Sequence, residues 1–130
     1  MTTSALSMLG SGTEGFFLMV EGGRIDHAGH DNDIGRNVLE TVGFSDAVRV
    51  VEDWALGRSD TLVLVTADHE TGGLGVVLHN NGRGGFPTVS WSTTSHTEAR
   101  VPVYAWGVNA QSVSGVMDNN TDLFGICAPR

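Results

Sequence analysis

Two continuous apolar runs, separated by a long helical pattern, constrain the fold of this chain more than any other feature. Residues 15–20 read GFFLMV, and residues 61–69 read TLVLVTADH, so polar groups gather at the end of the second run. Runs of this length without polar alternation are typical of strands buried on both faces, as in a parallel sheet. We therefore expect both runs to be strands of an α/β fold.

The stretch between the two runs has helical periodicity. From about residue 33 to residue 56, apolar side chains recur three or four positions apart, which predicts a long amphipathic helix. Gly43 leaves open a kink or two consecutive helices, and Gly57 is a natural C-terminal stop. Strand, helix and strand in succession predict a right-handed crossover between parallel strands.

The remaining elements are shorter, and we expect all of them to belong to a single domain that covers residues 1–130. A helix near the N-terminus is expected to be capped by Thr2, Thr3 or Ser4 and to stop at Gly10. Glycine-rich residues 73–90 predict a loop or hairpin insertion. Other elements are expected as strands within 88–97 and 101–107 and as a closing helix within 120–128.

The charge balance excludes some classes of partner. Seven Lys and Arg stand against fifteen Asp and Glu, which gives a formal net charge of −8. This charge repels phosphate backbones and anionic lipids, so we expect neither a nucleic-acid nor a membrane partner. No run approaches the roughly 18 apolar residues of a membrane span, and the first residues lack the pattern of a secretory signal.

Metal-binding side chains follow both predicted strands. Glu21 comes directly after the first run, and Asp68 and His69 end the second. Because parallel strands bring their carboxyl ends to one edge of a sheet, we expect a shared site there. Asp26 and His30 are four residues apart, which places a carboxylate and an imidazole on one side of a helical turn.

Taken singly, each of these side chains is better explained as a solvated carboxylate, a surface ion pair or a capping group. Oxygen and imidazole ligands without thiolates suit catalytic zinc, whereas a carboxylate corner suits magnesium, and the residues alone leave both open. Gly73 stands where a zinc-protease H-E-x-x-H motif would need its second histidine, which excludes that class. The chain also lacks the G-K-[ST] signature of a nucleotide-binding P-loop.

Three ordered motifs resemble those of the alkaline phosphatases, especially bacterial forms. They read FFLMVEGGRIDHAGH, LVLVTADHETGG and SHTEARVPVYAWG, and the resemblance covers roughly residues 1–127. It implies part of a three-layer α/β/α sandwich with a mostly parallel central sheet. It also implies hydrolysis of phosphate monoesters at a site with two zinc ions and one magnesium ion.

The resemblance also implies roles for individual residues. It makes Glu21 a magnesium ligand and assigns Asp26, His30 and His96 to the first zinc. The second zinc receives two ligands from this chain, Asp68 and His69. The position of His27 implies a place close to the substrate phosphate, with a tuning role. His96 would otherwise be interpreted as a structural histidine in a Ser/Thr-rich stretch.

The nucleophile of the family does not have a counterpart in this chain. The resemblance implies an Asp-Ser pair far upstream of these motifs, whereas Ser45 and Ser59 lie in a helical pattern and in a turn. We therefore expect the C-terminal, metal-binding part of an alkaline phosphatase that lacks the catalytic serine. A homodimer or a missing N-terminal segment would complete it, and the family implies a periplasmic or secreted location.

Two other functions remain open. The chain could be a non-catalytic zinc-binding fragment that serves as an association unit, with about one zinc ion per chain. A sulfatase or a phosphomutase would keep the metal-site architecture and act on a different ester, although the VEGG and SHT motifs argue against both.

Overall fold

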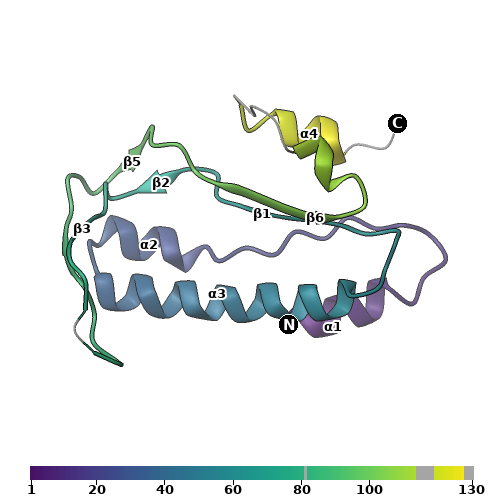
Figure 1. Cartoon of the computed structure of the whole chain (residues 1–130), viewed down its shortest axis with the longest axis horizontal. Coiled ribbons are helices and arrows are strands. Elements are labelled where there is room, and N and C mark those ends of the chain that lie inside the picture. The colour runs from purple at the N-terminus through teal and green to yellow at the C-terminus, as the bar shows by residue number, and fades with distance from the viewer. Residues whose placement is uncertain (81, 114–118, 128–130) are drawn as a thin grey trace.

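The computed structural model describes residues 1–80, 82–113 and 119–127 (Figure 1). Short strands and connecting segments lie along one side of a single long helix. The elements in chain order are α1 (Thr2–Leu9), α2 (Arg24–His30), α3 (Ile34–Ala55), β1 (Leu62–Thr66), β2 (Glu70–Thr71), β3 (Gly75–Leu78), β4 (Thr88–Ser90), β5 (His96–Thr97), β6 (Val103–Gly107), the 3₁₀ helix η1 (Ala110–Val113) and α4 (Asp122–Cys127).

The strands form three separate antiparallel pairs, which corrects the expectation of a mostly parallel sheet for the described residues. β1 pairs with β6, β2 with β5, and β3 with β4. The β3–β4 pair is a hairpin within the glycine-rich insertion predicted from the sequence. Among the described residues, the predicted crossover from residues 15–20 through α3 to β1 is not formed, because β1 pairs only with β6.

Residues 15–20 were expected to be a strand, and this prediction is wrong. The segment is extended but contains no strand in the structure. It shares the lining of a broad open trough with β1, and it belongs to none of the strand pairs of the described residues. Phe17 and Met19 are each 74% exposed as a result.

The helix expected between residues 33 and 56 is confirmed as the 22-residue α3. It begins at the N-cap Asp33, whose side chain accepts a hydrogen bond from the Arg36 amide, and it continues through Gly43 as one helix. Gly57 follows its end with φ of +78°, the left-handed conformation that favours glycine after a helix. α1 ends near Gly10 as expected, but its N-cap is Met1, which makes no capping hydrogen bond.

The core is thin for a chain of this size. The buried apolar residues of the described part are Leu6, Ala28, Val63 and Val113. The chain exposes 9408 Å², whereas a compact monomer of 13.7 kDa would expose about 6,600 Å². No helix in the described ranges is long and apolar enough to cross a membrane.

Candidate metal centre

α2 supplies the first two side chains of the candidate centre. Asp26 and His30 are one helical turn apart, so both point to the same side, and His30 Nε2 lies 3.4 Å from Asp26 Oδ1. The buried residues Ala28 and Gly29 carry the face of α2 that packs against α3 and β2. This packing directs Asp26 toward β2.

The pairing of β2 with β5 brings in the third side chain. His96 lies opposite Thr71 in the register of this pair, so a residue 66 positions after His30 reaches the same place. His96 Nε2 lies 3.1 Å from His30 Nε2 and 3.4 Å from Asp26 Oδ1. The structure thus brings together Asp26, His30 and His96, as the sequence-based interpretation requires.

The spacing of these three atoms fits a tetrahedral metal ion. Zinc bonds to nitrogen are about 2.0–2.1 Å long, so two ligands of one tetrahedral zinc lie about 3.3 Å apart. The separations of 3.1, 3.4 and 3.4 Å match that edge. Metal ligation by Asp26, His30 and His96 remains a prediction that this geometry supports.

Hydrogen bonds with Thr94 and Thr71 determine the state of two candidate ligands, His30 and Asp26. His30 Nδ1 lies 2.6 Å from the Thr94 carbonyl oxygen, which can only accept, so a neutral His30 carries its proton on Nδ1 and leaves Nε2 free. The pKa of Asp26 is lowered mainly by a hydrogen bond from the Thr71 hydroxyl; burial opposes this effect, and the nearby His30, His96 and His69 add to the lowering. The Asp26 carboxylate is therefore held in its anionic, ligating form.

A second pair of candidate ligands lies beside the first three. His69 Nε2 and Asp68 Oδ2 are 3.3 Å apart, and the imidazole of His69 stacks on that of His96 at a centroid distance of 3.5 Å. The Asp68 side chain is 82% exposed. Two protein ligands leave a zinc coordination shell incomplete, so a zinc ion held by Asp68 and His69 would need further ligands.

The other two predicted site residues lie outside the cluster of three. Glu21 is exposed just before α2 and lines the same open trough as Asp26 and His69. His27 is exposed on α2 and also lines the trough. Their predicted roles, as a magnesium ligand and beside the substrate phosphate, remain predictions.

Glu70 is a site residue that the sequence reasoning missed. Its carboxylate accepts hydrogen bonds from the Thr97 hydroxyl and from the amides of Gly73 and Leu74. The Thr97 hydrogen bond is the main reason that the pKa of Glu70 is lowered, and the two amides add to it. Glu70 thus ties the turn after His69 to the strand that carries His96. The position of Glu70 directly after His69 was the sequence signal that could have identified it.

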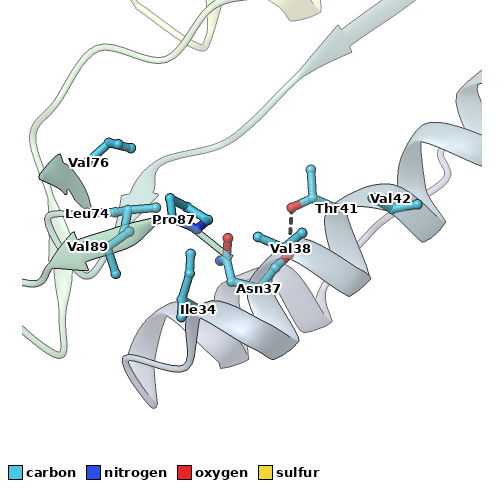
Figure 2. A pocket seen from close by; sticks show the side chains of 9 residues that line it. All are labelled: Ile34, Asn37, Val38, Thr41, Val42, Leu74, Val76, Pro87 and Val89. Atoms are coloured by element: carbon cyan, nitrogen blue, oxygen red, sulfur yellow. Dashed lines mark hydrogen bonds between the residues drawn. The ribbon is translucent and has the colours of Figure 1, made fainter. Parts of the chain in front are cut away.

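A second hollow lies away from the candidate ligands and has a different character. It has a volume of about 260 Å³ and lies between the first turns of α3 and the β3–β4 hairpin (Figure 2). None of its lining residues in the described part of the chain is titratable, so these residues offer no acid, base or metal ligand. Its apolar lining includes Ile34, Val38, Val42, Leu74, Val76 and Val89.

Comparison with known proteins identifies the family. The alkaline phosphatase family model matches residues 1–84. This chain belongs to the alkaline phosphatase family. The resemblance first drawn from the three sequence motifs is therefore confirmed, and an α/β fold follows from the family's solved structures.

Three characterised relatives illustrate the similarity. The chain is 47% identical over 76 residues to alkaline phosphatase 3 of Bacillus subtilis, covering 58% of this chain and 16% of the relative. It is 37% identical over 147 aligned positions to streptomycin-6-phosphate phosphatase of Streptomyces griseus, and the alignment covers 95% of this chain and 32% of the relative. The alkaline phosphatase of Escherichia coli is 33% identical over 140 positions, covering 95% and 29%. The chain spans at most about a third of these relatives.

Solved alkaline phosphatases share the arrangement of the elements. The enzyme from the Antarctic bacterium TAB5 superimposes with a TM-score of 0.75 at 32% identity, over 85% of this chain and 33% of that one. A variant of the TAB5 enzyme is described with Mg bound and gives the same score. The cold-active enzyme of Shewanella sp. superimposes with a TM-score of 0.84 at 25% identity, over 98% of this chain and 49% of that one.

Proposed function

We propose that this chain supplies the zinc-binding residues of a metal-dependent phosphomonoesterase. The observation that carries this proposal is the convergence of Asp26 Oδ1, His30 Nε2 and His96 Nε2 at separations that suit one zinc ion. Membership of the family supports the reaction class, and the streptomycin-6-phosphate phosphatase of S. griseus is named for a phosphate ester substrate.

The family resemblance implies a role for each of the proposed ligands, and their donor atoms suit those roles. Asp26, His30 and His96 would hold the first zinc, Asp68 and His69 would contribute to the second, and Glu21 would bind magnesium. Bound metal supplies Lewis-acid stabilisation of phosphoryl oxygens and lowers the pKa of a coordinated oxygen nucleophile. The Thr94 carbonyl and the Thr71 hydroxyl keep His30 and Asp26 in their ligating forms.

Catalysis also needs a serine nucleophile. Among the described residues, no serine hydroxyl is hydrogen-bonded to the Asp26, His30 and His96 side chains. The broad trough, with a volume of about 1700 Å³, leaves Asp26, Asp68 and His69 in its lining open to a further polypeptide. We propose that a further polypeptide segment supplies the serine, and that the enzyme acts in the periplasm or outside the cell.

Hydrolysis of p-nitrophenyl phosphate tests the proposal. With zinc, magnesium and a segment that carries the serine nucleophile supplied at alkaline pH, we expect phosphate release that chelation abolishes. His30→Ala and His96→Ala should each weaken zinc binding by more than about 100-fold, because each removes a direct ligand. His79→Ala is the matched control, since His79 is exposed in the glycine-rich loop. Absence of turnover with both metals and that segment present would remove the phosphatase proposal for this chain.

A second candidate function is a non-catalytic zinc-binding association unit. Three converging side chains suffice to hold one zinc, whereas Asp68 and His69 alone leave the second site incomplete. This function predicts about one zinc per chain and no hydrolysis. Two zinc ions together with turnover would reject it.

A further inference from the structure

Thr71 lies between the two groups of proposed metal ligands. Its hydroxyl oxygen is 2.6 Å from Asp26 Oδ1 and 3.2 Å from His69 Nδ1. Its backbone pairs with His96 across the β2–β5 ladder. One residue therefore contacts the first group through both its side chain and its backbone, and the second group through its side chain.

The chemistry of the hydroxyl fixes the direction of both hydrogen bonds. A threonine hydroxyl has one hydrogen to donate, and an ionised carboxylate can only accept. The hydrogen therefore points to Asp26, and the hydroxyl oxygen accepts from Nδ1–H of His69. A chain of hydrogen bonds runs from His69 through Thr71 to Asp26.

This direction determines the tautomer of His69. A proton on Nδ1 leaves the lone pair on Nε2, the atom that lies 3.3 Å from Asp68 Oδ2. The two candidate ligand atoms of the second site thus face the same space. His30 is prepared in the same way, since its Nδ1 faces the Thr94 carbonyl.

We propose that Thr71 is a positioning residue that orients the Asp26 carboxylate, fixes the tautomer of His69 and thereby couples the two zinc sites. The coupling rests on the proposed function, because it takes Asp26 and His69 as zinc ligands. The control of the His69 tautomer by Thr71 is independent of the proposed function, because it needs no bound metal. Groups that form hydrogen bonds to metal ligands typically contribute about 10- to 100-fold to metal affinity.

Removal of the hydroxyl tests the role of Thr71. Thr71→Val keeps the branched shape that suits a strand, and we expect zinc affinity to fall about 10- to 100-fold in isothermal titration calorimetry. Thr71→Ser retains the hydroxyl and should stay within about threefold of the parent chain. Thr41→Val is the matched control, since it removes a threonine hydroxyl that donates at 2.8 Å to the Asn37 carbonyl within α3 (Figure 2).

Nitrogen NMR of the imidazole rings gives a readout that is independent of metal. At alkaline pH without metal, His69 should be the Nδ1–H tautomer in the parent chain and should shift toward Nε2–H in Thr71→Val. Thr71→Ala, which also lacks the hydroxyl, should give the same shift if the valine variant folds poorly. Unchanged zinc affinity together with an unchanged His69 tautomer would overturn the inference.

The outcomes separate this inference from the proposed function. A parent chain that binds no zinc contradicts the proposed function and removes the coupling, while a tautomer shift would still support the positioning of His69. A chain that binds zinc in a Thr71-dependent way without turnover supports the inference and contradicts only the phosphomonoesterase.

Discussion

Gly29 and Thr71 touch at the point where α2 crosses β2. A Cβ atom on Gly29 would lie 3.0 Å from both the carbonyl oxygen and the Cβ of Thr71. This approach is closer than side chains normally allow, so the absence of a side chain at Gly29 lets the helix reach the strand. Asp26, on the same face of α2 one turn earlier, thereby comes within hydrogen-bonding distance of Thr71.

Gly29→Ala should therefore weaken both folding and zinc binding. The added methyl would push α2 away from β2, and overpacking of this kind costs about 1–3 kcal/mol, more than the gain of about 0.5–1 kcal/mol in helix propensity. Urea unfolding and zinc titration measure the two effects. Gly43→Ala is the matched control, because a Cβ there meets nothing within 4 Å, and it should stabilise α3. Equal behaviour of the two variants would contradict the prediction.

Features that depend on local sequence were predicted most successfully. The periodicity of residues 33–56 gave α3, because helical hydrogen bonds join residues four apart and the pattern contains all that the helix needs. The Asp26–His30 spacing is equally local, and the structure places those two side chains together. For the glycine-rich residues 73–90 the sequence left a loop and a hairpin open, and the structure has the β3–β4 hairpin there.

Non-local pairing was beyond the reach of the sequence patterns. An apolar run indicates a strand only if a neighbour supplies backbone hydrogen bonds, and residues 15–20 face an open trough instead. His96 entered through family resemblance alone, because its place depends on its register against Thr71. Glu70 was missed for the same reason, since its main partner Thr97 lies 27 residues away.

Glu70 should make the stability of the chain depend on acid pH. Hydrogen bonds from Thr97, Leu74 and Gly73 lower its pKa below the ordinary value of 4.5, so the unfolded chain takes up this proton more readily. The stabilisation is fully present above pH 4.5 and is lost as the pH falls through the folded-state pKa. Urea midpoints between about pH 3 and about pH 7 measure it.

The Glu70→Gln variant should have a lower urea midpoint at neutral pH and a flatter pH profile. Some acid dependence should remain, because the pKa of Asp26 is also lowered and contributes with the same sign. Glu98→Gln is the control, since Glu98 is an exposed carboxylate close to Thr97 in the sequence. Identical pH profiles for the two glutamine variants would contradict the role given to Glu70.

The exposed apolar lining of the trough should make the isolated chain associate. Phe17 and Met19 are each 74% exposed there, and the chain's 9408 Å² far exceeds the area of a compact monomer of its mass. Contiguous apolar surface of this kind drives association, so sedimentation velocity should show dimers or larger species that grow with concentration. The double substitution Phe17→Ser with Met19→Ser should shift the chain toward monomer.

Leu39→Ser is the matched control, because Leu39 is 66% exposed on α3 but does not line the trough. A parent chain that remains monomeric at every concentration, or equal effects of the two sets of serine substitutions, would show that the trough is not the associating surface.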